Sequence, residues 1–187
     1  MVAPLDTARL HLRAWTLTEA DAAAFARIWA DPRATWWSHA LDPRESRRAL
    51  ARIIRHSAAM PAGLGWRAVV ERGGGAVVGG VMLQPAAYAD EVELGYHIDR
   101  PHWGRGFATE AAGALLAHGR DALGLDRVVA AIHPENRASR RVARKLGMRR
   151  IGEVTHEGRV HDLYLAELKS PTSHAGGAGR GASSGNK

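Results

Sequence analysis

The sequence predicts an α+β domain of mixed character, with a central β-sheet of about seven strands and about four flanking helices. The chain has 187 residues, of which 45% are hydrophobic, and this size suits one domain with one core. Segments with the two-residue period of strands are interspersed with segments that have the period of helices. The chain contains no cysteine, which excludes a disulfide framework, a thiolate zinc site and a cysteine nucleophile.

The N-terminal part of the chain contains one strand and two helices. Residues 9–14 alternate apolar and polar side chains, a pattern that predicts a half-buried strand. A capping box at Thr18 and Asp21 predicts the start of the first helix. The second helix is expected to begin at Asp42, which can cap it, because Pro43 fits the first helical position.

The remaining strands and helices are predicted from the same two periodicities of apolar residues, that of strands and that of helices. The glycines at 73–75 join two strands into a hairpin, and Gly124 is the expected cap of the third helix. The expected strands are residues 66–71, 76–83, 91–98, 128–132, 150–154 and 160–166, and the expected helices are a segment that runs to residue 123 and residues 136–146.

The C-terminal residues 170–187 are rich in Gly and Ser, basic, and without a large apolar side chain. Such a segment cannot bury enough surface to offset the entropy of ordering it. We therefore expect one domain at residues 1–169 and a disordered tail. No run of 18 apolar residues and no basic-then-apolar leader is present, so a soluble, cytoplasmic protein is expected.

Positive charge gathers near the fourth helix. The formal net charge is +7, which suits a phosphate-rich ligand or a polyanionic partner without choosing between them. A solvated helix face is an equally good interpretation of this cluster. The basic residues between positions 136 and 152, where no acid occurs, are Arg137, Arg140, Arg141, Arg144, Lys145, Arg149 and Arg150.

A glycine-rich turn between a strand and a helix is the strongest chemical signal. The segment Trp103-Gly104-Arg105-Gly106-Phe107-Ala108-Thr109-Glu110 leads into the third helix. Amides in a first helical turn lack intrahelical acceptors, the helix dipole is positive there, and glycines let a pyrophosphate approach closely. A flexible loop is the alternative. A P-loop is excluded because the chain has no Gly-x-x-x-x-Gly-Lys-Ser/Thr segment. A dinucleotide-binding fingerprint is excluded because its third glycine would fall at Thr109.

This segment resembles the Gln/Arg-x-x-Gly-x-Gly/Ala motif of the Gcn5-related N-acetyltransferase (GNAT) family, with Trp103 in place of Gln or Arg. Asn136-Arg137-Ala138-Ser139 and Arg144-Lys145-Leu146-Gly147-Met148 resemble the family's second coenzyme-binding segment. Residues 7–13 and 93–98 resemble the branch that contains the ribosomal-protein alanine N-acetyltransferases (RimJ/RimL-like). The resemblance covers about 160 residues and implies a twisted, mixed sheet.

The resemblance implies acetyl-coenzyme A as co-substrate. Asn136 is expected to orient the pantetheine arm, with a plain helix cap as the alternative, and Arg137 and Arg140 are expected near the ribose phosphate. Backbone amides near Ile98 are expected to receive the thioester oxygen. The whole expected coenzyme site is Ile98, Trp103, Gly104, Arg105, Gly106, Phe107, Ala108, Thr109, Asn136, Arg137, Ser139 and Arg140.

The family's reaction is direct attack by a neutral amine on the thioester, which calls for a base and allows an acid. The resemblance makes Glu93 the candidate base, and Glu91, two residues away on the same strand face, is the alternative and a candidate acceptor contact. Many relatives use a tyrosine as the acid, but Ala143 occupies its position. Ser139 is the candidate acid, or else it bonds its own helical turn.

The acceptor is left open by the sequence. Trp36 and Trp37 are expected to line its pocket or to pack in the core. The resemblance implies that the acceptor is a primary amine, such as a protein N-terminus or a small molecule. The protein is expected to be a monomer or a homodimer. The ten histidines form no His-x-x-x-His pair, so no metal is expected. Two non-catalytic alternatives are a basic ribosome- or RNA-docking protein and a coenzyme A sensor. The first is disfavoured because the basic helix of this chain has no interleaved aromatic residues on which bases could stack.

Overall fold

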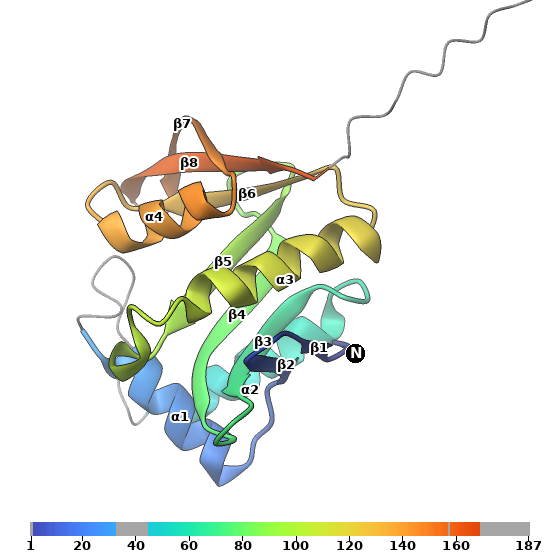
Figure 1. The fold of residues 1–187 in the computed structure, drawn as a ribbon, viewed down its shortest axis with the longest axis vertical. Helices are drawn as coiled ribbons and strands as arrows, with labels where there is room; N and C mark the ends of the chain where they lie inside the picture. The colour runs from blue at the N-terminus through green and yellow to red at the C-terminus, as the bar shows by residue number, and fades with distance from the viewer. Residues whose placement is uncertain (1, 33–44, 157, 169–187) are drawn as a thin grey trace, which may run out of the picture.

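The computed structural model describes residues 2–32, 45–156 and 158–168 of the chain. Its centre is one sheet of eight strands in the order β1-β2-β3-β4-β5-β6-β8-β7 (Figure 1). All neighbouring strands are antiparallel except β5 and β6, which are parallel. The strands are β1 (Leu5–Asp6), β2 (Leu10–Ala14), β3 (Gly65–Glu71), β4 (Val77–Pro85), β5 (Val92–Ile98), β6 (Arg127–Ile132), β7 (Arg149–His156) and β8 (Arg159–Glu167).

The two faces of the sheet are covered by different pairs of helices (Figure 1). Helices α3 (Phe107–Asp121) and α4 (Arg137–Lys145) lie on one face, and α1 (Glu19–Ala30) and α2 (Ser46–Ala59) lie on the other. A short 3₁₀ turn, η1 (Arg100–His102), links β5 to the glycine-rich turn before α3. The predicted mixed α+β sheet with four helices is confirmed, and β1 is an addition of two residues that pair with Leu12 and His11.

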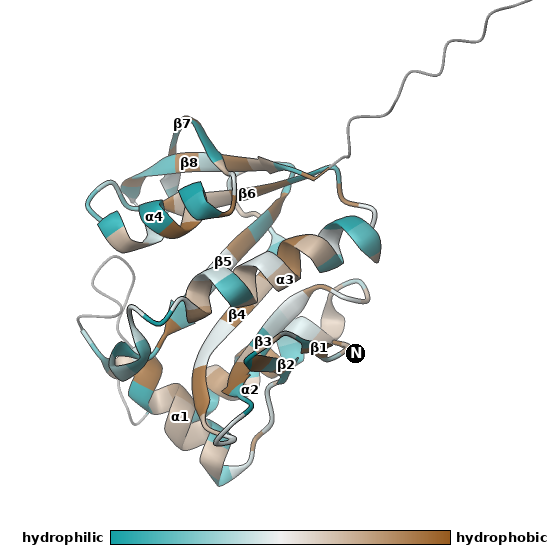
Figure 2. Cartoon of the chain, in the orientation of Figure 1, coloured by the Kyte–Doolittle hydropathy of each residue, from teal (hydrophilic) through white to brown (hydrophobic). Residues whose placement is uncertain are grey.

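Each face has its own apolar core. Under α3, the core includes Leu94 and Ile98 of β5 and Phe107 and Leu115 of α3. On the other face, Trp15, Phe25 and Trp29 pack together beneath α1 and α2. In Figure 2, apolar residues follow the central strands, whereas α4 is largely hydrophilic. Strand β5 contributes to both layers, because the ring of His97 lies 5.1 Å from that of Trp29 on this second face.

Helix boundaries differ from expectation at two places. Helix α2 begins at Ser46, with Glu45 as its N-cap residue, and the predicted start at Asp42 lies outside the described residues. Helix α3 ends at Asp121, two residues earlier than predicted. Gly124 adopts a left-handed φ of 64° in the connection that follows, where the Leu125 amide bonds to the Gly119 carbonyl. The predicted C-terminal tail also lies outside the described residues.

Candidate active site

Strands β5 and β6 open a cavity where they part. They pair at Val92 with Val128 and at Glu93 with Val129, and no further. Beyond this point the edge of β5 that faces β6 has no strand partner in the described chain. A cavity of about 530 Å³ lies in the opening, lined by the end of β5, by η1 and the glycine-rich turn, by the start of α3 and by α4 with the residues that precede it.

The start of α3 presents free backbone donors to this cavity. Gly106 is the N-cap residue with φ 84°, and no side chain caps the helix there. Gly104 also has a left-handed φ, of 78°. Since the first-turn amides at 107–109 lack intrahelical acceptors, and these residues line the cavity, this end of the helix can bind a phosphate group. A side chain at Gly106 would be strained by the backbone angle alone.

An ion-paired anchor holds the turn in place. Glu110, in the first turn of α3, accepts hydrogen bonds from the Thr7 hydroxyl at 2.6 Å and from the Arg9 amide at 2.9 Å. Arg9 Nε donates to the same carboxylate at 2.8 Å, and Arg9 Nη1 donates to the Arg105 carbonyl at 3.0 Å. Although burial raises the pKa of Glu110, these bonds lower it below its usual value. The N-terminal segment thus fixes the anion site.

Two residues that the sequence places in the coenzyme site have other partners. The Arg105 guanidinium lies 4.4 Å from the Phe107 ring centre and pairs with Glu71, and Arg105 does not line the cavity. Trp103 lines the cavity, but its indole N–H donates to the Ile98 carbonyl at 2.6 Å. The indole therefore fixes the end of β5.

Helix α4 closes the opposite side of the cavity. Asn136 is buried and its Oδ1 accepts a hydrogen bond from the Ser139 amide at 3.0 Å, so it caps the helix as well as lining the cavity. Tyr96 of β5 donates its phenol proton to the Ser139 carbonyl at 3.2 Å. Burial raises the pKa of Tyr96 to about 12, so its hydroxyl stays protonated at neutral pH. Ser139 and Tyr96 both line the cavity.

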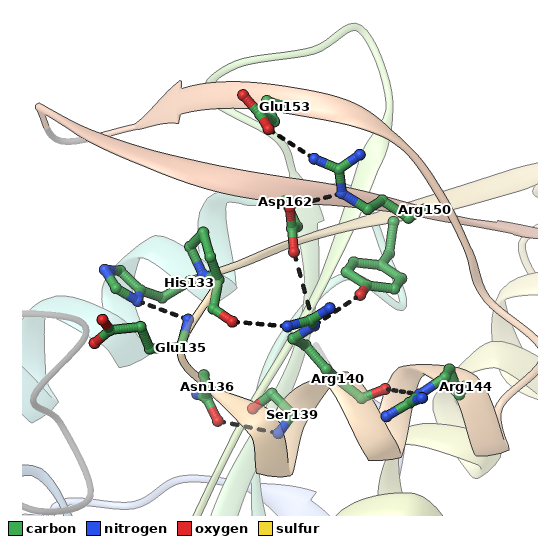
Figure 3. A network of polar contacts seen from close by, with 11 residues as sticks. His133, Glu135, Asn136, Ser139, Arg140, Arg144, Arg150, Glu153 and Asp162 are labelled. Atoms are coloured by element: carbon green, nitrogen blue, oxygen red, sulfur yellow. Dashed lines mark hydrogen bonds and ion pairs between the residues drawn. The ribbon is translucent and has the colours of Figure 1, made fainter.

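The basic side chains of α4 divide into two sets. Arg137, Arg141 and Lys145 line the cavity, and their spacing of four residues places them on one helix face. Arg140 instead points to β8, where its guanidinium lies 3.7 Å from the buried Asp162 and donates to the Pro134 carbonyl at 2.9 Å (Figure 3). Of the two arginines expected near the ribose phosphate, Arg137 lines the cavity and Arg140 does not. Arg141 and Lys145 could have been predicted as cavity residues, because they follow Arg137 at intervals of four residues and so share its helix face.

The candidate bases lie outside the cavity lining. Glu93 is the last residue of β5 that pairs with β6, so it stands at the apex of the opening. It shares a strand face with His97, whose ring lies 5.1 Å from that of Trp29 on the α1 side. Glu91 precedes β5 and forms an ion pair with Arg127. The hydroxyl of Tyr88, a residue with no recognisable signal in the sequence, lies beside Glu93 and has a pKa raised by burial and by that carboxylate.

Trp36 and Trp37, the predicted acceptor contacts, lie outside the described residues. Across residues 2–32, 45–156 and 158–168, no cluster of three or more histidine or carboxylate side chains is arranged to bind a metal ion. None of the described helices has the length and apolar character needed to cross a bilayer.

Comparisons with known proteins agree with this geometry. Residues 9–149 match the family described as acetyltransferase (GNAT) domain. The uncharacterized N-acetyltransferase YoaA of Bacillus subtilis (strain 168) is 30% identical over 175 residues, which are 89% of this chain and 97% of YoaA.

Two solved structures share the fold. A GNAT-family acetyltransferase from Bacillus anthracis superposes with a TM-score of 0.76 at 22% identity, covering 89% of this chain and 99% of that one. RimL, a ribosomal L7/L12 alpha-N-protein acetyltransferase in complex with coenzyme A, superposes with a TM-score of 0.68 at 17% identity, covering 88% and 98%.

The family match spans most of the chain, and the glycine-rich turn, the parted strands and the basic face of α4 fit the phosphates and the long arm of coenzyme A. The protein belongs to the GNAT acetyltransferase family and is an N-acetyltransferase whose co-substrate is acetyl-coenzyme A.

Proposed function

We propose that the protein transfers the acetyl group of acetyl-coenzyme A to a primary amine by direct attack within a ternary complex. The observation that carries the proposal is the parting of β5 and β6 at Glu93, with a phosphate-binding helix start at one end of the opening and a carboxylate at its apex. The coenzyme and the amine can then reach the apex from different sides of the sheet.

Coenzyme binding uses two groups of donors. The amides at 107–109 and the flanking glycines receive the pyrophosphate, because anions bind at helix N-termini whose amides are free. Arg137, Arg141 and Lys145 supply positive charge along the facing wall for the remaining phosphate. The pantetheine arm lies along the unpaired edge of β5, beside the hydrogen-bonded pair Tyr96 and Ser139.

Glu93 is the proposed base. Its place at the apex, on the strand face opposite Tyr96, lets it take a proton from an amine that arrives from the α1 side. Glu91 is the weaker candidate because it precedes β5 and so lies before the point at which β5 and β6 part. The proton reaches Glu93 directly or through one water, and the neutral amine then attacks the thioester carbonyl.

Ser139 is the proposed acid for the departing thiolate. It lines the cavity one helical turn before Ala143, where many relatives carry tyrosine. Its amide is already bonded to Asn136 and its carbonyl to Tyr96, so the backbone of Ser139 is fixed while its hydroxyl remains the group that can face sulfur.

An amine panel with acetyl-coenzyme A tests the proposal. Free thiol release is followed with alanyl and seryl peptides, free amino acids, polyamines and aminoglycosides. Amine-dependent release with formation of the acetylated amine supports the proposal, and the best acceptor defines the acceptor class. Coenzyme binding without release for any amine would overturn it in favour of a coenzyme sensor.

A further inference from the structure

Tyr88 is held next to the candidate base by a tight loop. The loop between β4 and β5 is closed by a hydrogen bond from the Ala86 amide to the Glu91 carbonyl at 2.9 Å. From this loop the Tyr88 side chain folds back so that its hydroxyl is buried, beside the Glu93 carboxylate and the backbone of Ala131. The hydroxyl therefore lies where β5 and β6 cease to pair.

The contact between the hydroxyl and Glu93 is loose. Burial and then the charge and hydrogen-bonding contact of Glu93 raise the pKa of Tyr88, and the Ala131 backbone also contacts the hydroxyl. None of these contacts has the distance and angle of a well-formed hydrogen bond. A buried hydroxyl without a well-placed partner destabilises the fold, since its interaction with water is lost on folding. Such a group next to a carboxylate is a natural place for a small polar ligand.

A row of three histidine rings extends from the ring of Tyr88. The ring of His156, on β7, lies 5.3 Å from the Tyr88 ring in an edge-to-face arrangement. His161 of β8 lies 6.2 Å from His156, and His133, just after β6, lies 5.9 Å from His161. The Tyr88 ring therefore packs directly against His156, at the end of this row.

We propose that Tyr88 and Glu93 together receive the acceptor amine, either directly or through one bound water, which makes Tyr88 a further catalytic residue of the reaction. The inference rests on the proposed function. The amine arrives as an ammonium ion and gives one N–H to the Tyr88 oxygen and another to Glu93, which takes the first proton. As the neutral amine forms the new C–N bond and the C–S bond breaks, a second proton leaves the nitrogen and the thiolate takes up one proton from Ser139 or from water.

The test compares Tyr88→Phe with Tyr164→Phe. Tyr164 is a matched control because its hydroxyl accepts a hydrogen bond from Arg140 on the α4 side of the sheet. Tyr88→Phe should lower kcat/KM for the amine by about 10-fold, with unchanged affinity for coenzyme A. It should also raise the unfolding temperature slightly, because a loosely bonded buried hydroxyl is removed. Tyr164→Phe should do the reverse, lowering stability and leaving turnover intact.

A double-mutant cycle gives the second readout. If Tyr88 and Glu93 act on one amine, the double variant Tyr88→Phe/Glu93→Gln should turn over at nearly the rate of Glu93→Gln alone. Full additivity, unchanged kcat/KM in Tyr88→Phe, or a fall in its unfolding temperature would each overturn the inference. No amine-dependent thiol release from the parent protein would instead overturn the proposed function, so the two failures are distinguishable.

Discussion

The phenol of Tyr96 donates a hydrogen bond to the Ser139 carbonyl and so joins β5 to α4 across the cavity. This bond lies on the stretch of β5 that has already parted from β6. The width of the coenzyme channel is therefore set in part by one side chain. Burial keeps this phenol protonated, because its pKa is raised to about 12.

Tyr96→Phe should weaken the binding of coenzyme A. The loss of one hydrogen bond worth about 1 kcal/mol corresponds to about a fivefold rise in Kd. Calorimetric titration with coenzyme A measures the change, and thermal unfolding of the same sample shows whether the fold is intact. Unchanged affinity in a folded variant would mean that the channel is held open without this bond.

Glu93→Gln should lower turnover at neutral pH by about 10²-fold, the usual effect of losing a general base. The deficit should shrink at high pH, because solvent then deprotonates the amine and leaves little for a base to do. Ser139→Ala should show a deficit that does not recover with pH. Initial rates between pH 6.5 and 10 measure both.

Glu91→Gln is the matched control for Glu93→Gln. Its carboxylate pairs with Arg127, at a part-exposed position where ion pairs contribute little, so its rate should stay near that of the parent. Full activity in Glu93→Gln together with a loss in Glu91→Gln would show that the neighbouring carboxylate is the base.

The double variant Arg141→Gln/Lys145→Gln should bind coenzyme A about 10-fold more weakly, since two cations are removed from the cavity wall. The difference from the parent should decrease as salt is added, because charge screening grows. Arg144→Gln is the control: this exposed arginine lies on the same helix but does not line the cavity. An equal loss in the control would mean that the overall charge of α4 is what matters.

His97 should make the protein less stable in mild acid. Burial lowers its pKa to about 4, whereas an unfolded chain protonates histidine near 6.5. As pH falls from 6.5 toward 4, the unfolded state takes up a proton that the folded state does not, so the free energy of unfolding decreases. In His97→Gln this dependence should be weaker by about 1 kcal/mol between pH 6.5 and 5, measured by urea unfolding. Parallel curves for the two proteins would contradict the assignment.

Local periodicity was enough to predict most of the fold. The capping box is a clear example, because the Thr18 hydroxyl accepts from the Asp21 amide as its spacing implied. The Asp21 carboxylate, however, accepts from Arg13 and Thr16. That partnership depends on how β2 meets α1 and has no signature in the local sequence.

The parts of the candidate site that are formed by the backbone could be predicted from the sequence. The parts that depend on which side chains contact one another could be predicted less well. The glycine-rich turn follows from φ angles that favour glycine at 104 and 106. Arg140 was expected near the ribose phosphate, and the sequence does not show that Asp162, 22 residues further on in β8, lies 3.7 Å from its guanidinium. Tyr88 and Tyr96 were not predicted because their partners depend on tertiary packing.

The contact between Arg9 and Glu110 joins residues 101 positions apart in the chain. The glycine-rich turn is therefore held in place by a contact that closes a long loop of chain, and contacts of this kind form slowly during folding. A ligand that binds only the finished site would trap the closed chain and stabilise it by mass action, so acetyl-coenzyme A should also assist maturation of its own binding site.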